Sequence, residues 1–329
     1  MSNSASYDVA IIGGGPAGLS AAIWLGRYLH RVLLIDSGDP RNWETRGVNG
    51  YLGRPRVLPA ELRGEGRDEA RRFGAELVDG EVRQVERLEE ERFRITYEAL
   101  RVRPRVENGR GTREGLVVGS EGVHIAEARR ILLAFGIRDI WPDIEGLERC
   151  YGDTVHHCPD CDGHEAIGCR TVVVASGRKA AGMALALATW TREIVICTNG
   201  EPADIDAENL ARLDALGIPI LEQRALRMVS RGSEARQLEL ENGMSLDCER
   251  LFFAIGHVPA DDLGAQLGCE RDEEGLIVVD SSCHSSVRNV YAAGDIVPGP
   301  HLAIRAASDG AIAALAIHKS LLPELQRLA

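Results

Sequence analysis

The feature that most constrains the fold is a glycine-rich run near the start of the chain, residues 13–18 (GGGPAG). A short apolar segment, residues 7–12, precedes the run, and an alanine-rich segment, residues 19–25, follows it. This order predicts a buried strand, a tight turn and a helix. A glycine run in that context is typical of a dinucleotide-binding fold, in which the N-terminus of the helix faces the phosphates.

Three glycines of the run have separate roles in such a fold. Gly13 permits the tight turn, Gly15 lets a pyrophosphate approach the backbone, and Gly18 lets the helix pack closely against the strand. A second predicted strand, residues 31–35, ends at Asp36. This carboxylate lies about twenty residues beyond the glycines, where such folds bind the ribose hydroxyls. We therefore predict a dinucleotide site formed by the turn and Asp36.

The same order of elements returns later in the chain. Residues 171–175 predict a strand, residues 176–182 a turn, and residues 193–197 a strand after an Ala/Leu-rich helix. The repeat predicts an α/β fold of two Rossmann-like, three-layer domains. Candidate linkers near residues 142–146 and 256–259 place the second domain inside the first. We expect residues 1–144 and 257–329 to form one domain and residues 145–256 the inserted one.

Between the glycine run and the first linker the patterns are weaker. Residues 60–73 predict a helix with mixed charges, which we interpret as a solvated face. Strand-like runs follow, and two of them, residues 115–118 and 131–136, are read as separate strands. Residues 101–114 are basic and contain glycine, so we expect an exposed hairpin or loop without an assigned role.

Two cysteines separated by two residues, Cys158 and Cys161, lie in the expected inserted domain. In a chain with strand, helix, strand patterning, such a pair is typical of a redox-active disulfide. Cysteine reacts as the thiolate, which needs a base, a helix N-terminus or a positive charge nearby. His156, His157 and His164 are the candidates for that base.

Two other interpretations of the cysteine pair stay open. The first is a zinc site, whose further ligands would come from Cys150, Cys169, His157 and His164, although no second CxxC exists. The second is a purely structural disulfide, which a reducing compartment does not maintain. We therefore prefer the redox interpretation and expect no metal.

The overall charge bears on the partners. Asp and Glu number 50 against 38 Lys and Arg, which leaves a net charge of −12. Phosphate backbones require basic clusters, so nucleic acid is not an expected partner. No run reaches the roughly eighteen apolar residues of a membrane span, and the first residues lack the basic region of a leader. We expect a cytoplasmic protein with no membrane association, in which most of the 8 cysteines are reduced.

Three motifs in a fixed order make the chain resemble the low-molecular-weight thioredoxin reductase family over essentially its full length. They are the glycine run, CPDCDG at residues 158–163, and YAAGD at residues 291–295. The resemblance implies an FAD-dependent disulfide oxidoreductase and a homodimer formed through the FAD domain. It also implies a set of FAD contacts around the first turn, the second strand and the last helix, namely Gly13, Gly15, Pro16, Ala17, Gly18, Asp36, Asn42, Gly294, Asp295, His301, Leu302 and Ala303.

The resemblance further implies roles at the cysteine pair. Cys161 would face the flavin, and Cys158 would meet the partner, which is a thioredoxin-like protein or a small dithiol or disulfide. Asp162 would be the acid and base for the thiols, with His157 and His164 as rivals for that role.

Two departures from the family pattern concern the electron donor. Ala175 and Ser176 stand where the family has glycines, and each added side chain moves a pyrophosphate away from the backbone. Residues 197–200 (CTNG) stand where the family has a His-Arg-Arg cluster for the 2′-phosphate of NADPH. Both departures argue against NADPH as the electron donor. Phe135 departs from the pattern as well, with no assigned consequence.

A degraded nucleotide site is similar to that of two variant branches of the family. One branch contains dithiol oxidases, which pass electrons from a small dithiol through flavin to oxygen. The other takes electrons from ferredoxin and delivers them to thioredoxin. We therefore predict an FAD-dependent dithiol or disulfide oxidoreductase that uses ferredoxin or another donor in place of NADPH. Three alternatives stay open: a dithiol oxidase, an NADPH-dependent thioredoxin reductase, and a flavin-bound redox sensor without turnover.

Overall fold

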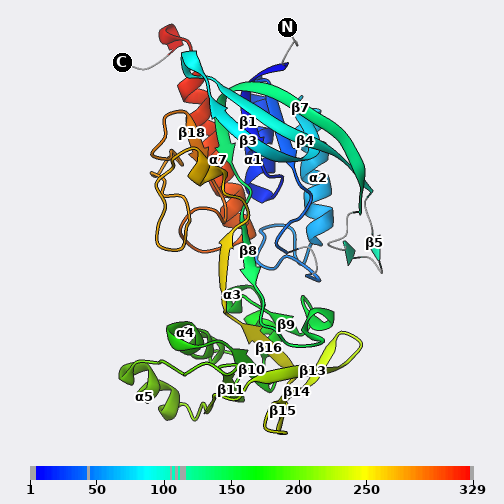
Figure 1. Ribbon diagram of the computed structural model, residues 1–329, viewed down its shortest axis with the longest axis vertical. Helices are drawn as coiled ribbons and strands as arrows, with labels where there is room; N and C mark the ends of the chain where they lie inside the picture. The colour runs from blue at the N-terminus through cyan, green and yellow to red at the C-terminus, as the bar shows by residue number, and fades with distance from the viewer. Residues whose placement is uncertain (1–4, 43–44, 104–105, 108–109, 112–115, 327–329) are drawn as a thin grey trace. The chain divides into compact units, whose positions relative to one another are not determined.

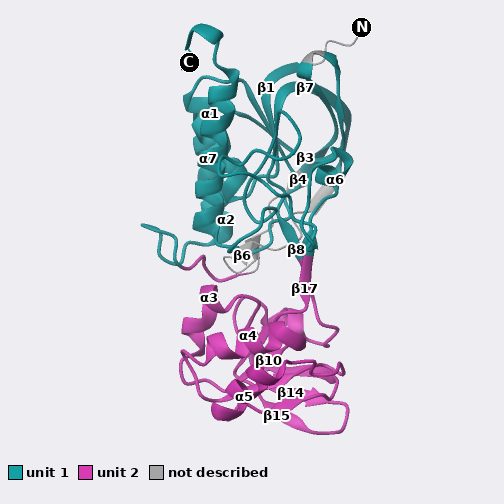
Figure 2. Ribbon diagram, turned by 90° about the vertical axis from the view of Figure 1, so that its left-hand side faces the viewer, with its two compact units in different colours: residues 1–43, 50–138, 258–329 teal, residues 44–49, 139–257 magenta. Residues whose placement is uncertain are grey.

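The computed structural model describes residues 5–42, 45–103, 106–107, 110–111 and 116–326. The chain divides into two compact units (Figure 2). Residues 1–43, 50–138 and 258–329 form unit 1, and residues 44–49 and 139–257 form unit 2. The chain passes between the units along β8 (Ile137–Ile140) and β17 (Gly256–Pro259), which pair with each other. The segment 44–49 is far in sequence from the rest of unit 2, and nothing in the sequence assigned it there.

Unit 1 contains a parallel sheet (Figure 1), whose two first strands in the chain are largely buried. In spatial order it consists of the first part of β3 (Glu76–Arg87), β2 (Val32–Asp36), β1 (Ala5–Ile12), the last part of β7 (Leu116–Leu133) and β18 (Val290–Ala292). Helices α1 (Pro16–Arg27) and α7 (Ala303–Leu321) pack on one face of the sheet, and α2 (Pro59–Arg72) packs beside α1. Both faces of the sheet are covered, which explains why all five residues of β2 are buried without alternation.

An antiparallel meander covers the other face of this sheet. It is formed by β3, β4 (Phe93–Arg103) and the first part of β7, and its apolar side chains pack on the parallel strands. Phe135, unexplained from the sequence, packs against this same core. Residues 101–114 lie partly outside the described residues. Their described part contains a short antiparallel pair, β5 (Val106–Glu107) and β6 (Arg110–Gly111).

The expectation of two separate strands at residues 115–118 and 131–136 is wrong, because residues 116–133 form the single strand β7. Residues 116–128 of this strand pair with β4, and residues 126–133 pair with β1. Gly119 and Gly122 both have positive φ beside irregularities in the β4 register. Bulges of this kind bend a strand, so that the first part of β7 pairs with β4 and its last part with β1.

Unit 2 repeats the same layers. Its parallel sheet has the order β12 (Ile220–Leu221), β11 (Ile194–Cys197), β10 (Thr171–Val174), β16 (Arg250–Phe253) and β9 (Val155–His156). Helices α4 (Gly177–Leu187) and α5 (Ala207–Ala215) pack on one face. A meander of β13 (Ala225–Arg231), β14 (Glu234–Leu240) and β15 (Ser245–Asp247) packs on the other. The predicted α/β class with two Rossmann-like domains, the second inserted in the first, is confirmed.

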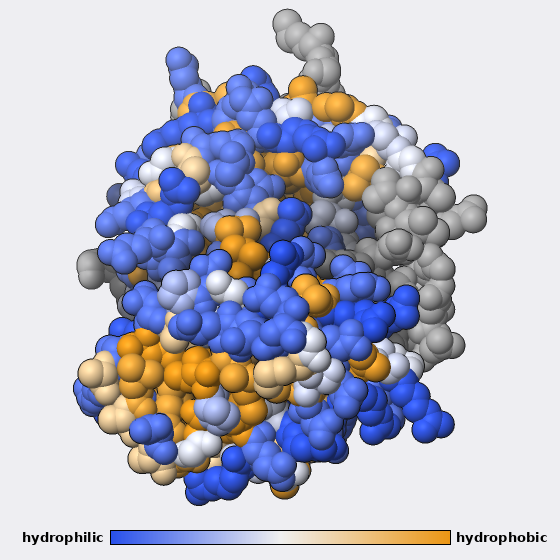
Figure 3. Space-filling model, turned by 60° about the horizontal axis from the view of Figure 1, so that its bottom comes forward, coloured by the Kyte–Doolittle hydropathy of each residue, from blue (hydrophilic) through white to orange (hydrophobic). Residues whose placement is uncertain are grey.

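The surface is mostly hydrophilic in the view of Figure 3, with one large hydrophobic area at the lower left and smaller hydrophobic spots elsewhere. Large apolar side chains that are exposed in unit 2 are Ile140, Ile167, Leu210, Leu216, Leu226, Met244 and Ile255. Across the described ranges, no helix has both the length and the apolar character that a membrane crossing requires.

Candidate functional site

The glycine run forms the turn between β1 and α1. Gly13 has a φ of +108°, and a Cβ there would collide with the backbone of Ala134. A Cβ on Gly18 would collide with the carbonyl oxygen of Gly13, so the helix packs directly on the end of the strand. A Cβ on Gly15, by contrast, would meet no atom within 4 Å. The turn is therefore closed on its protein side and open on the side where a pyrophosphate approaches.

Asp36 ends β2 and lies against this turn, since a Cβ on Gly14 would meet its carboxylate. Arg63 and Arg67 of α2 both donate hydrogen bonds to Oδ2 of Asp36, the second at 3.2 Å. Burial acts to raise the pKa of Asp36, but the charge and hydrogen bond of Arg63, aided by Arg67, outweigh it and hold the pKa below its usual range. The interpretation of α2 as a solvated face is therefore wrong at these two arginines, whose long side chains reach the buried carboxylate.

The end of β18 lies beside the same turn. Gly294 has a φ of +82°, and a Cβ there would lie 2.9 Å from the Cβ of Ala17. The next residue, Asp295, accepts a hydrogen bond from Arg41 at 3.1 Å. Arg41 precedes Asn42 in the loop after β2. The end of β18, the start of α1 and the loop after β2 thus meet at one edge of the sheet.

The remaining expected flavin contacts stand at the start of α7. His301 lies in the preceding loop, Leu302 is the N-cap and Ala303 is the first helical residue. Pro16 occupies the corresponding first turn of α1, where its missing N–H is not needed. All these residues follow the carboxyl ends of parallel strands, which is where open α/β sheets bind their ligands. The open cradle at Gly15 and the ionised carboxylate of Asp36 fit a dinucleotide such as FAD.

Cys158 and Cys161 form a disulfide in unit 2, with their Cα atoms 5.3 Å apart. Cys158 is the N-cap of the short helix α3 (Pro159–Asp162), and its sulfur accepts a hydrogen bond from the backbone N–H of Cys161 at 3.1 Å. A donor of this kind stabilises a thiolate once the disulfide opens. Gly163 follows, and a Cβ there would collide with the ring of Trp190.

Asp162 is held from two sides. Nδ1 of His156 lies 3.5 Å from Oδ2 of Asp162, and Nδ2 of Asn49 lies 3.3 Å from Oδ1. The same Asn49 nitrogen donates to the carbonyl oxygen of Cys161 at 3.0 Å. Asn49 thus links the cysteine pair to the neighbouring carboxylate. Sequence reasoning missed this residue, and no local pattern around it pointed to the site.

The three candidate histidines have different surroundings. His156 is buried and contacts Asp162. Nδ1 of His157 lies 2.7 Å from the hydroxyl of Tyr151, and its Nε2 lies 3.9 Å from Asp139. His164 is exposed. The structure therefore brings His156 to the expected acid and base, while His157 is engaged elsewhere.

The other cysteines do not resemble the pair. Burial raises the pKa of Cys248 to about 12 and that of Cys283 to about 12, so both are poor nucleophiles at neutral pH. Within the described part of the chain, no group of three or more His, Cys, Asp or Glu side chains is placed to hold a metal ion.

The turn between β10 and α4 corresponds to the glycine turn of unit 1 but has fewer glycines, and residues 203–204 lie against it. The backbone N–H of Gly177, the first residue of α4, donates to the carbonyl oxygen of Ala203 at 2.8 Å. A Cβ on Gly177 would lie 3.5 Å from the carbonyl oxygen of Asp204. The N–H of Ala203 in turn donates to Glu222 at 2.8 Å. The N–H of Gly177 is therefore already bonded to a carbonyl oxygen, at a turn where a Rossmann fold offers N–H groups to a pyrophosphate.

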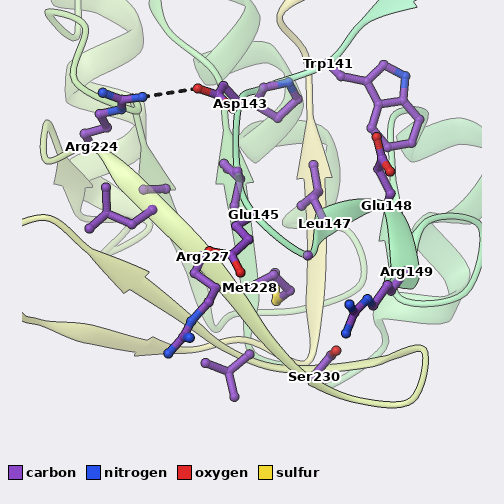
Figure 4. A pocket seen from close by; sticks show the side chains of 16 residues that line it. Trp141, Asp143, Glu145, Leu147, Glu148, Arg149, Arg224, Arg227, Met228 and Ser230 are labelled. Atoms are coloured by element: carbon purple, nitrogen blue, oxygen red, sulfur yellow. Dashed lines mark hydrogen bonds and ion pairs between the residues drawn. The ribbon is translucent and has the colours of Figure 1, made fainter.

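A cavity of about 850 Å³ lies elsewhere on unit 2, between residues 141–149 and residues 224–230 (Figure 4). Its walls carry charges of both signs, and Arg224 forms an ion pair with Asp143 at 3.2 Å. The side chain of Arg224 also lies beside Gly200, 3.5 Å from the position of an added Cβ. None of the residues that line the cavity belongs to the cysteine pair.

Comparison with known proteins finds similarity across both units. Residues 7–310 match the family model described as pyridine nucleotide-disulphide oxidoreductase. The thioredoxin reductase of Bacillus subtilis is 26% identical over 96% of this chain and 95% of its own length. Thioredoxin reductase tcpT of Claviceps purpurea is 26% identical, with 98% and 100% covered. The crystal structure of HlmI is 32% identical, with 98% of this chain and 93% of that chain covered, at a TM-score of 0.83.

Proposed function

Because this chain belongs to the pyridine nucleotide-disulphide oxidoreductase family, we propose that it exchanges electrons between FAD and a dithiol or disulfide partner through Cys158 and Cys161, without NADPH. At the coarser level it is a thioredoxin reductase-like flavin enzyme that acts on a sulfur group, as its relatives are. The electron donor, the dithiol or disulfide partner, and the residues that act at the FAD site and at the cysteine pair are proposed below.

The observation that carries the proposal is the contrast within unit 2. The cysteine pair has a nearby carboxylate and a thiolate-stabilising N–H, so it is equipped for disulfide exchange. The neighbouring nucleotide fold has its turn covered by the carbonyl oxygens of Ala203 and Asp204. A pyrophosphate placed there would meet acceptors where it needs donors. Electrons are therefore supplied or removed by something other than NADPH, for which ferredoxin is a candidate donor.

The FAD site of the proposal is in unit 1. The turn at Gly13, Gly15 and Gly18 would hold the pyrophosphate, and Asp36 would hold a ribose, with Arg63 and Arg67 keeping that carboxylate ionised. Bound FAD supplies an acceptor or donor of two electrons. Asn42, Asp295 and the start of α7 complete the set of contacts, and a homodimer through unit 1 and a cytoplasmic location belong to the same proposal.

The partner of the proposal is a thioredoxin-like protein or a small dithiol or disulfide. Thioredoxin reductase is the name of the relatives above, which supports the first class. When a dithiol reduces the pair, a new disulfide forms in the substrate and the Cys158–Cys161 bond breaks. Two electrons pass to the cysteines, and two protons leave the substrate thiols for the cysteine sulfurs. Asp162, the residue after Cys161, would carry these protons.

A second candidate function is an NADPH-dependent thioredoxin reductase. The position of Arg224 favours it, because the first carbons of this side chain lie beside Gly200, in the loop where the family binds the 2′-phosphate, and an arginine there could turn its guanidinium to a phosphate. The ion pair with Asp143 must break before Arg224 can take a phosphate.

The deciding experiment is an anaerobic titration of the FAD-loaded protein, with the flavin absorbance as readout. We expect no bleaching by NADPH or NADH at micromolar concentrations and complete bleaching by dithiothreitol. Cys158→Ser should abolish the dithiol-driven bleaching while the flavin stays bound. Rapid bleaching by NADPH would overturn the proposed donor and establish the second candidate, whereas Cys158→Ser with full activity would remove the cysteine pair from the mechanism.

A further inference from the structure

The contact between His156 and Asp162 has an unusual setting. His156 is 4% exposed, ends β9, and packs against the ring of Phe252 at a centroid distance of 5.2 Å. Its Nδ1 faces Asp162 at 3.5 Å. Its Nε2 is buried and has no hydrogen-bond partner among the residues that the structure describes. One edge of the ring is therefore polar and faces the site, and the other edge is enclosed by protein.

This asymmetry selects a proton position. An imidazole with its proton on Nε2 would bury an N–H without an acceptor, which is rarer and costlier than a bare ring nitrogen. With the proton on Nδ1, the ring can donate to the carboxylate of Asp162. The backbone of His156 is paired with that of Phe252 across β9 and β16, the same residue whose ring it packs against. The polar edge of the buried ring thus faces Asp162.

We propose that His156 is a positioning residue for disulfide exchange, one that holds the Asp162 carboxylate toward the cysteine pair. Asn49 donates to the other carboxylate oxygen and to the carbonyl oxygen of Cys161, so the Asp162 carboxylate lies between Asn49 and Nδ1 of His156. This inference rests on the proposed function, because the proton that Asp162 carries is the one exchanged between substrate thiol and cysteine sulfur. Loss of the His156 donor would leave the disulfide intact and slow its opening.

The other histidines do not offer this arrangement. His157 directs its ring nitrogens toward Tyr151 and Asp139, and His164 is exposed. In the proposal, Asp162 keeps the acid and base role for which His157 and His164 were the other candidates. His156 acts through Asp162.

The test measures the rate of flavin reduction by excess dithiothreitol in a stopped-flow instrument, with the FAD-loaded protein and three variants of one position. His156→Asn places an amide nitrogen near the position of Nδ1, His156→Gln places one near Nε2, and His156→Leu removes both. We expect the Leu and Gln variants to lose about 10- to 100-fold in the limiting rate, a part of the ~10²–10⁴ that a placed acid–base group contributes. The Asn variant should keep most of the rate, and the dithiol concentration at half-maximal rate should not change.

A double-variant cycle separates positioning from packing. In an Asp162→Asn background, His156→Leu should cause no further loss of rate, because the carboxylate it positions is gone. Equal rates for the Asn and Gln variants, or a further loss in the Asp162→Asn background, would overturn the inference. A wild-type protein whose flavin is not reduced by dithiols would instead refute the proposed function, so the two failures are distinct.

Discussion

Replacement of Gly163 by alanine tests how the cysteine pair is held in place. Gly163 has φ −60° and ψ −30°, a conformation that alanine adopts without strain. An added Cβ would lie 2.6 Å from Cε3 and 2.7 Å from Cη2 of Trp190. Carbon atoms pack at about 3.5–4.0 Å, so the ring must move by roughly 1 Å. Overpacking of this size costs about 1–3 kcal/mol, against a gain of about 0.4–1 kcal/mol from the stiffer unfolded chain.

We therefore expect Gly163→Ala to destabilise unit 2 by about 1–2 kcal/mol. The assay is denaturant unfolding of the FAD-loaded protein, followed by tryptophan fluorescence, which reports on both units because Trp24 lies in unit 1 and Trp141 and Trp190 lie in unit 2. Flavin fluorescence reports on unit 1 alone, so the transition of unit 2 is the part of the tryptophan signal that the flavin does not share. Gly182→Ala is the matched control, because a Cβ at this α4 position meets open space. It should stabilise unit 2 by about 0.5–1 kcal/mol.

A double variant at Gly163 and Trp190 tests whether the ring causes the loss of stability. Trp190→Phe leaves a smaller ring at the contact, so Gly163→Ala should cost less in that background. Unchanged stability of the single variant, or the same cost in the Trp190→Phe background as in the wild type, would show that the ring does not restrict this position.

Two further predictions concern charge and thiol reactivity. Asp36→Asn should destabilise the protein by about 3–5 kcal/mol at neutral pH, because Arg63 and Arg67 lose their buried carboxylate. Since the pKa of Asp36 in the folded protein is lowered, its contribution to stability is present above the ordinary pKa of about 4 and is lost as the pH falls below it. The difference in unfolding free energy between the wild type and Asp36→Asn should therefore be smaller at pH 3 than at pH 7. An equal difference at both pH values would contradict the pairing. In the reduced protein at pH 8, iodoacetamide should label Cys158 long before Cys248 and Cys283, because burial raises the pKa of each of the last two thiols to about 12. Peptide mass spectrometry measures the order of labelling, and early labelling of Cys248 or Cys283 would contradict it.

The local patterns of the chain predicted the elements that depend on neighbours in sequence. The glycine turn, the cysteine pair and the strand before Asp36 combine residue types whose spacing itself indicates their geometry. The pairing of the single strand β7 with both β4 and β1 was not predictable, because the middle of this strand is polar and is bulged at Gly119 and Gly122.

The residues missed in the candidate site share another cause. Arg63 and Arg67 look like surface charges on a helix, and only the folded chain shows that their side chains reach Asp36. Asn49 and Asp162 are 113 positions apart, and no periodicity relates them. The choice of His156 over its neighbours depends on which way each ring points, which the sequence HHC leaves undetermined.

The assignment of residues 44–49 to unit 2 has a consequence for how the protein is made. Asn49 bonds the carbonyl of Cys161, and the N–H of Arg46 donates to the carbonyl of Gly152 at 3.2 Å. During synthesis these residues leave the ribosome about a hundred residues before their partners, at about 5–20 residues per second. They must wait several seconds, and a fragment that begins at residue 139 would never receive them. The cysteine unit is thus completed by a segment of chain that is translated before it, and it cannot be transplanted as a continuous cassette.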